Sequence, residues 1–322
     1  MDHVATITRM LERPWALPRS MVEAIASRLS GPSAAMPVIS AEAAAALAAA
    51  RAPSRAGSVA VLPIMGVMRQ HGAQDIFEMI FGGGGVSTER TIAELRSLLG
   101  DESVGAIVLN IDSPGGEVYG TPELAEEVYK ARGIKPIVAV ANSQTFSAAY
   151  WVASQADEIV VTPSGEVGSI GVWTLHADFS EMDKSMGVKF TLISAGRLKT
   201  AANDYEPLDE EARDLLQKGV DEYYDMFVRA VARGRGVTPA QVRGGFGEGW
   251  IVGAKEAVSM KMADRVGTLR DTVARLAGSR PGASARAEGG PPVPVAGAEG
   301  GISPEEDLDL RERERRLSRA GR

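Results

Sequence analysis

Two glycines follow a buried strand pattern in the segment IDSPGGEVYG, residues 111–120. Gly115 and Gly116 stand where this strand turns into a helix, and glycine adopts backbone conformations that other residues avoid. Such a turn leaves N–H groups facing open space, which is how proteins build a backbone oxyanion hole. The segment therefore indicates either an oxyanion site or a plain tight turn.

A candidate nucleophile stands in the segment VANSQTFSAAYWVAS, residues 140–154. Ser147 follows another apolar strand pattern, and the small residues after it would let a substrate backbone approach. The N–H of Ala148 could donate to the same oxyanion. A serine at a helix start is also a common N-cap, and Ser143 and Thr145 are rival hydroxyls.

A serine nucleophile needs a base. The three histidines, His3, His71 and His176, have no neighbouring pattern that specifies a catalytic role. A lysine can serve instead when burial lowers its pKa. Lys199 stands in the small-residue loop SAGRLKTAANDYEPL after a predicted strand, and it is the best candidate among the eight lysines. The alternative is an ordinary loop lysine.

The elements that must position these residues alternate along the chain. Strands are predicted at 58–66, 104–112, 136–142, 158–162, 168–175 and 188–196. Helices are predicted at 91–100, 121–133, from about 146, and at 180–187 and 208–233. Continuous apolar strands alternating with amphipathic helices predict an α/β fold with a parallel sheet covered on both faces.

Composition divides the chain into four parts. Residues 1–56 predict an N-terminal helical arm that packs on a neighbour or on the main domain. Residues 57–277 carry the alternating pattern of the main domain. The Gly/Pro/Ala-rich stretch 278–302 predicts a disordered linker, and 303–322 predicts a charged terminal helix with a capping box.

Composition also excludes several classes of protein. The net charge of −7 argues against a nucleic-acid binder held by phosphate contacts. The chain has no cysteine and three histidines, so we expect neither a metal site nor a cofactor. No apolar run approaches the roughly 18 residues of a transmembrane helix. The N-terminus lacks a signal-peptide core, so we expect no membrane anchor and a cytoplasmic location.

Four motifs occur in order: DSPGG, then S-A-A-Y-W, then V-G-S-I-G-V, then A-G-x-x-K. Together they make residues 58–276 resemble the signal peptide peptidase A / protease IV family of serine peptidases. The resemblance implies a crotonase-like fold, shared with the Clp protease subunit, with stacked parallel sheets flanked by helices. It also implies a Ser–Lys dyad and assembly into a homo-oligomer.

The resemblance assigns a role to each candidate residue. Ser147 would be the nucleophile and Lys199 the general base. Ser169 would hydrogen-bond to the lysine and orient it. The backbone N–H groups of Gly115 and Ala148 would form the oxyanion hole.

Two departures favour the phage branch of the family, the head-maturation proteases. The nucleophile motif reads F-S-A-A-Y where bacterial members usually show A-S-G-G-Y, and a linker and charged helix follow the main domain. We therefore expect an endopeptidase that cleaves capsid or scaffold proteins and its own tail, in the host cytoplasm or prohead. The apolar segment 76–81 would lie at a subunit interface or along the substrate path, or alternatively pack within its own chain.

Three alternatives stay open. The chain could be a cellular cytoplasmic peptidase of the same family. It could be a crotonase-type enzyme whose glycine turn binds the oxyanion of an acyl thioester, although such an enzyme does not need the Ser–Lys pair. It could also be an assembly protein with an inactive protease domain. Labelling by a serine-directed probe separates the last alternative from the others.

Overall fold

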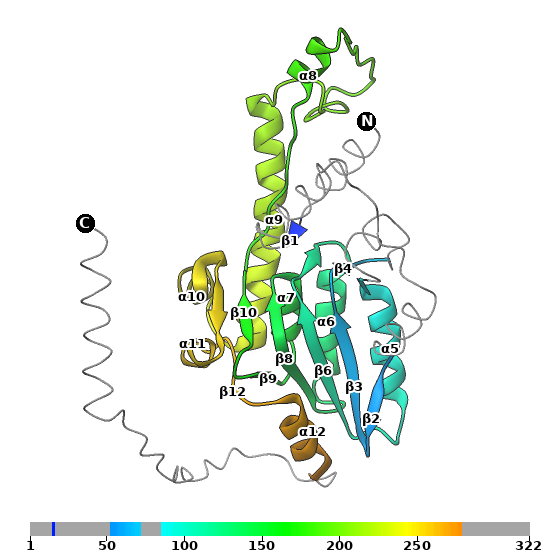
Figure 1. The fold of residues 1–322 in the computed structure, drawn as a ribbon, viewed down its shortest axis with the longest axis vertical. Coiled ribbons are helices and arrows are strands. Elements are labelled where there is room, and N and C mark those ends of the chain that lie inside the picture. Colours follow the sequence, from blue (N-terminus) through cyan, green and yellow to red (C-terminus); the bar gives the residue numbers. More distant parts are fainter. Residues whose placement is uncertain (1–14, 17–51, 72–84, 279–322) are drawn as a thin grey trace, which may run out of the picture. The chain divides into compact units, whose positions relative to one another are not determined.

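The computed structural model describes residues 15–16, 52–71 and 85–278 (Figure 1). The apolar segment 76–81, the linker after Gly278 and the terminal helix predicted at 303–322 lie outside the described residues. So does most of the predicted N-terminal arm. Each of these remains a prediction from the sequence.

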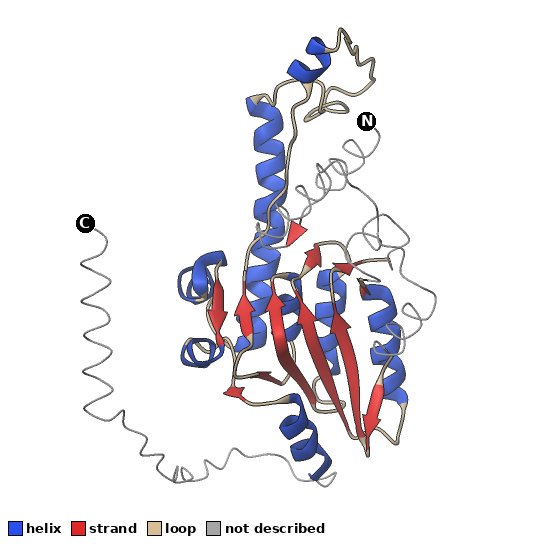
Figure 2. Cartoon of the chain, in the orientation of Figure 1, coloured by secondary structure: helices blue, strands red, loops and turns tan. Residues whose placement is uncertain are grey.

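The strands form two sheets (Figure 2). Their bounds are β1 Trp15–Ala16, β2 Ser54–Ala56, β3 Val59–Met65, β4 Met68–Arg69, β5 Val86–Ser87, β6 Ala106–Ser113, β7 Gly116–Glu117, β8 Ile137–Phe146, β9 Glu158–Val161, β10 Glu166–Gly168, β11 Ile251–Gly253 and β12 Arg265–Val266. The larger sheet runs β11-β10-β8-β6-β3-β2, with β9 on β8 and β12 on β9. The smaller sheet runs β1-β7-β4-β5.

Helices connect most of these strands. Their bounds are α5 Thr88–Gly100, α6 Thr121–Ala131, α7 Ala148–Ala153, α8 Ser180–Ser185, α9 Glu210–Arg235, α10 Pro239–Gly245, α11 Ala254–Ser259 and α12 Leu269–Gly278, with a short 3₁₀ turn at Gly247–Gly249. Residues next to the helix N-termini determine where two of the helices begin. Asp209 caps α9 by accepting a hydrogen bond from the N–H of Ala212, and Thr238 forms a capping box at α10.

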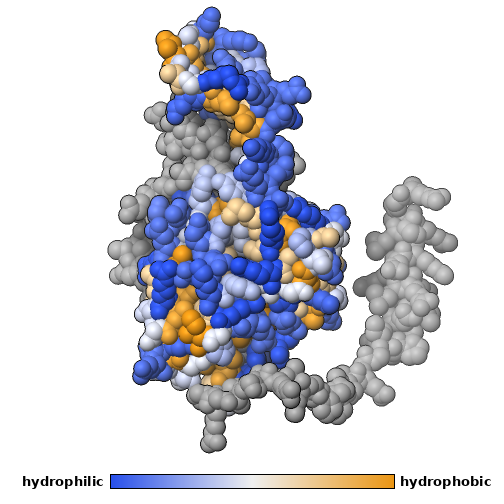
Figure 3. Space-filling view, turned by 180° about the vertical axis from the view of Figure 1, so that it is seen from behind, coloured by the Kyte–Doolittle hydropathy of each residue, from blue (hydrophilic) through white to orange (hydrophobic). Residues whose placement is uncertain are grey.

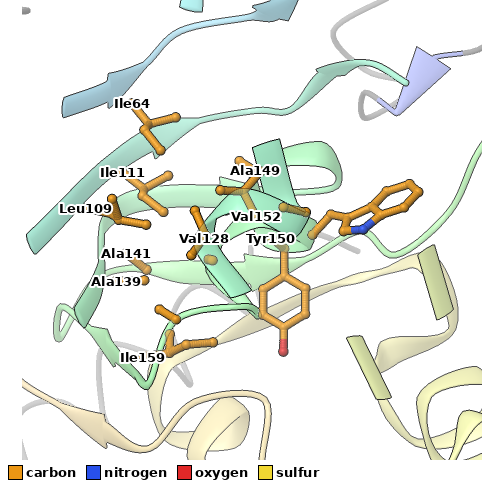
Figure 4. Packing of buried hydrophobic residues seen from close by; sticks show 14 of the residues in the cluster. Ile64, Leu109, Ile111, Val128, Ala139, Ala141, Ala149, Tyr150, Val152 and Ile159 are labelled. Carbon is orange, nitrogen blue, oxygen red and sulfur yellow. The ribbon is translucent and has the colours of Figure 1, made fainter. Parts of the chain in front are cut away.

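The central strands β3, β6, β8 and β10 are parallel. Their side chains alternate between two apolar clusters on the two faces of the sheet. Helices α5, α6, α7 and α9 cover one face, where α7 packs on β6 and β8 (Figure 4). Helix α12 covers the other face through Leu269, Val273 and Leu276. This confirms the predicted parallel sheet flanked by helices.

Two predicted strands are wrong in whole or in part. The strand expected at 168–175 ends at Gly168, and no strand forms at 188–196. Both stretches belong to the segment 172–209, which we call the spur and which leads from β10 to α9 by way of α8. Residues 188–196 are exposed, and their apolar side chains have no neighbouring strand among the described residues. Their alternating pattern therefore marks an exposed apolar surface and not a buried strand.

The long helix α9 joins the spur to the main domain (Figure 1). Its C-terminal half buries one side, with Phe227 stacked on Trp151 of α7 at a ring separation of 4.6 Å. Its N-terminal end contacts the spur, where Glu211 of α9 forms an ion pair with Arg197 at 2.6 Å. The spur therefore lies beyond the end of α9 that does not pack on the sheet.

Candidate active site

The glycine turn lies between β6 and β7 and is held by Ser113. The Ser113 hydroxyl donates to the carbonyl of Gly66 at 2.7 Å and accepts the N–H of Gly115 at 3.1 Å. Gly115 has a φ of 100°, a conformation that favours glycine. At Gly116 a Cβ atom would lie 1.9 Å from the carbonyl oxygen of Met68. Both glycines are therefore required by the backbone itself.

Gly116 offers an N–H group that the sequence analysis did not single out. The Met68 N–H donates to the carbonyl of Gly115 at 2.8 Å, and Met68 is the register partner of Gly116 in a parallel pair. In such a pair the N–H and C=O of Gly116 face away from β4. Gly115 N–H already has an acceptor in Ser113, so Gly116 N–H is the donor of this turn that faces the β1 side of β7.

Ser147 occupies a sharp turn between β8 and α7. Its backbone has φ 53° and ψ −119°, a conformation that costs a non-glycine residue about 1–3 kcal/mol. Its N–H donates to Gly168 at 2.7 Å, its carbonyl accepts from Trp151 at 2.9 Å, and all residues of α7 are buried. The surrounding core therefore holds the serine in a strained position, as nucleophile turns require.

Ser147 and Ser169 lie at the carboxyl ends of neighbouring strands. The residues just before them, Phe146 and Gly168, are register partners in β8 and β10. Ser169 also has a positive φ of 54°, and its N–H donates to the carbonyl of Trp250 at 2.8 Å. The structure therefore brings together two of the three predicted catalytic residues.

The other hydroxyl candidates are placed less well for catalysis. Ser143 and Thr145 both lie within β8, whereas Ser147 stands in the turn that follows it. The Ser147 hydroxyl makes a long contact of 3.5 Å with the carbonyl of Gly171. The N–H of Ala148, the first in α7, has no acceptor among the described residues. It is thus available beside the Ser147 hydroxyl.

Lys199 is not brought to Ser147 within one chain. It is exposed on the spur, and its ammonium has no hydrogen bond or ion pair in the described part of the chain. Two residues before it, Arg197 pairs with Glu211 at the start of α9. Phe227, which stacks on Trp151, comes sixteen residues later in α9, or about 24 Å along the helix axis. The lysine thus lies far from the serine of its own chain.

The two histidines that the structure describes are not placed to act as the base in place of Lys199. His176 lies on the spur with its Nε2 3.1 Å from the carbonyl of Asn203, and His71 pairs with Glu89 on the surface. Within residues 52–71 and 85–278, no hydrogen bond joins the Ser147 hydroxyl to a lysine or histidine. Within the described residues, the predicted nucleophile and the predicted oxyanion donors therefore have no base at hydrogen-bonding distance.

The buried Tyr150, three residues after the predicted nucleophile Ser147, stabilises the fold around it. Burial raises the pKa of Tyr150, so its phenol stays protonated, and the hydroxyl donates to the carbonyl of Met262 at 2.9 Å. This bond ties α7 to the loop after α11. It supports the turn that holds Ser147 and takes no part in proton transfer.

Comparison with known proteins gives consistent matches. Residues 130–280 match the model of peptidase family S49. The chain is 31% identical to "Capsid assembly protease C" of Escherichia phage lambda, over 72% of this chain and 52% of that protein. It is 30% identical to "Head-tail preconnector protein GP5" of Enterobacteria phage P21, over 68% and 42%. It is 33% identical to "Putative protease MJ0651" of Methanocaldococcus jannaschii, over 56% and 58%.

The chain thus spans about half the length of the curated relatives it matches. Among the helices that the structure describes, none is both long enough and apolar enough to cross a membrane.

Proposed function

Because this chain belongs to peptidase family S49, we propose that it is a serine endopeptidase with Ser147 as its nucleophile. The observation that carries the proposal is the strained backbone of Ser147, held at the end of β8 next to Ser169. A plain helix cap has an extended backbone and gains nothing from such strain. Ser147 is buried in this structure, and what a nucleophile gains from such a turn is a fixed position for its hydroxyl.

The reaction follows from the groups present. The Ser147 hydroxyl attacks the scissile carbonyl, and its proton passes to the neutral amine of Lys199. The oxyanion accepts hydrogen bonds from the backbone N–H groups of Ala148 and of the glycine turn. Gly115 must first leave the Ser113 hydroxyl to take part, whereas Gly116 N–H already faces the edge. The lysine then protonates the leaving amine, and water hydrolyses the acyl-enzyme.

We place the base in a second copy of the chain. Glu211, which pairs with Arg197 two residues before Lys199, lies about 24 Å along α9 from Phe227, which stacks on Trp151 of α7. A spur from a neighbouring subunit can bring this lysine to the site, where Ser169 would orient it. The dyad is then shared between two chains, and a single chain is inactive.

The surface of the spur supports this assembly. Several large apolar side chains on it are exposed, as Figure 3 shows. They are Leu175, Met182, Met186, Val188, Phe190, Leu192, Ile193 and Leu198, of which Ile193 is 95% exposed. A concentration of exposed apolar groups marks an interaction surface. Since this surface precedes Lys199 directly in sequence, burying it against another copy would also remove water from the lysine.

Capsid-assembly proteins are the substrates we propose. Two relatives in the comparison carry the names of a capsid assembly protease and a head-tail preconnector protein. The Ala-, Gly- and Ser-rich stretch 278–302 of this chain is a second candidate substrate, because small side chains suit a shallow pocket. Relatives from cellular organisms, such as MJ0651, favour a general peptidase as the alternative.

The test compares three proteins: wild type, Ser147→Ala, and Ser143→Ala as the matched control on β8. Each is treated with a fluorophosphonate probe and then incubated with capsid and scaffold proteins. We expect labelling and discrete cleavage products, read by mass spectrometry, from wild type and Ser143→Ala only. Labelling that persists in Ser147→Ala would refute the assignment of the nucleophile. If the labelled enzyme form cleaves unfolded proteins in general but does not cleave capsid proteins, the result favours the general peptidase.

A further inference from the structure

A strand from the N-terminal segment lies on the edge of the glycine turn. Trp15–Ala16 form β1, which pairs antiparallel with β7 in the register Trp15 with Glu117 and Ala16 with Gly116. Strand β1 is the outer strand of the smaller sheet. It joins β7 from about one hundred residues away in the sequence, so local sequence does not impose the contact.

The register places a backbone carbonyl opposite the oxyanion donor. Because Met68 pairs with Gly116 from the β4 side, the N–H and C=O of Gly116 face β1. Their partner on that side is Ala16. The Gly116 N–H that would bind a substrate oxyanion is therefore directed at the backbone of Ala16.

An extended peptide substrate would need the same edge. Substrate strands commonly add to an exposed sheet edge, where backbone hydrogen bonds supply the affinity. Only one side of β7 is open to such a strand, because β4 occupies the other. A peptide that presents its carbonyl to Gly116 and Ser147 must therefore take the place of β1.

We propose that the Trp15–Ala16 strand is a built-in competitor of substrate. It occupies the β7 edge as a pseudosubstrate and keeps the site closed until a peptide displaces it. The inference rests on the proposed peptidase function for its kinetic consequence, while the docked strand is testable without activity.

The test uses the full chain with a single substitution. Ala16→Pro removes the N–H of Ala16 and disfavours a paired strand. The matched control is Ala52→Pro, since Ala52 is exposed and lies outside every strand. Hydrogen–deuterium exchange is measured on the peptide that contains Gly116 and Glu117, in proteins that also carry Ser147→Ala.

We expect faster exchange at Gly116, whose N–H faces β1, in Ala16→Pro, no change at Glu117, whose N–H faces β4, and no change at either residue in Ala52→Pro. In the active background, Ala16→Pro should lower KM for a short peptide at unchanged kcat. If the strand covers the edge about nine-tenths of the time, KM falls about tenfold. A synthetic peptide LERPWALPRS, residues 11–20, should inhibit the Ala16→Pro enzyme competitively, whereas a scrambled peptide should not.

The outcomes separate the two proposals. Unchanged exchange together with unchanged KM overturns the pseudosubstrate strand, whatever the activity of the protein. Faster exchange without hydrolysis by any variant upholds the docked strand and refutes the peptidase function. Faster exchange with a lower kcat and the same KM shows that β1 supports the site and does not compete for it, which also overturns the inference.

Discussion

The N–H of Ser147 donates a 2.7 Å hydrogen bond to the carbonyl of Gly168. This bond joins the turn that carries the nucleophile to the last residue of β10, from which the chain continues to the spur. The geometry of the serine is thus coupled to the direction in which the spur leaves the sheet. A spur that docks on another subunit acts on the site through this short path.

Subunit mixing tests whether the dyad is shared. Ser147→Ala and Lys199→Ala should each lose about 10²–10⁴-fold in kcat, because each removes one member of the proton-transfer pair. An equimolar mixture that has been dissociated and reassembled should regain about a quarter of the wild-type sites, since random pairing restores one site in four. The rate of hydrolysis of a fluorogenic peptide measures this.

Two further variants control the experiment. Lys189→Ala removes another exposed lysine of the spur and should keep its activity. Lys199→Arg should be inactive, because a guanidinium keeps its proton at working pH. A mixture that stays as inactive as its components would place both members of the dyad in one chain.

Gly116→Ala should damage both stability and catalysis. Its Cβ would lie 1.9 Å from the carbonyl oxygen of Met68, so β4 and β7 must separate. We expect a loss of about 1–3 kcal/mol in the free energy of unfolding and about 10²–10³-fold in kcat. In the control Gly100→Ala the new Cβ meets nothing within 4 Å, and stability should stay the same or rise. Urea titration and peptide hydrolysis provide the measurements.

Phe227→Ala should release α9 from the sheet domain. Phe227 is fully buried and stacks on Trp151, so the truncation should cost about 3–5 kcal/mol. Its neighbour Met226 is 43% exposed, and Met226→Ala should change stability by no more than about 0.5 kcal/mol. Equal losses in the two variants, measured by urea unfolding, would contradict the packing described for α9.

An ion pair predicts how stability depends on pH. Burial acts to raise the pKa of Asp264, but hydrogen bonds from Arg235 and from the Ile159 N–H outweigh it and hold this pKa below its usual range. A depressed carboxyl pKa adds stability above the unfolded pKa of about 4, and that stability is lost at lower pH. Asp264→Asn should therefore lower Tm at pH 7 and have a much smaller effect near pH 2. A constant difference in Tm across this range would count against the ion pair.

Much of the sheet domain was predictable from the sequence. The apolar runs at 104–112 and 136–142 form central parallel strands, because a strand covered on both faces has few polar positions. The run at 188–196 has similar apolar content and forms no strand. An apolar sequence pattern predicts that side chains will be buried. It does not tell whether they will be buried by the same chain or by another one.

The site was predictable in its residue types and less so in its geometry. Ser147 and Ser169 meet because Phe146 and Gly168 are in register, and register is a property of the folded sheet. The role of Gly116 depends on whether its backbone N–H points toward β4 or away from it, which the register with Met68 decides. Strand β1 has two residues and thus no period to detect. These features depend on pairing between distant segments, which one sequence does not reveal.

The contact between Ser169 and Trp250 sets an order of events during synthesis. Strand β10 is completed on its outer side by β11, residues Ile251–Gly253, and the Ser169 N–H donates to the Trp250 carbonyl. A nascent chain that ends before this point already contains Ser147, the glycine turn and Lys199. It lacks the strand that fixes Ser169. We therefore expect the ribosome-bound chain to stay inactive until its domain is nearly finished, so that translation itself delays the appearance of a protease beside newly made proteins.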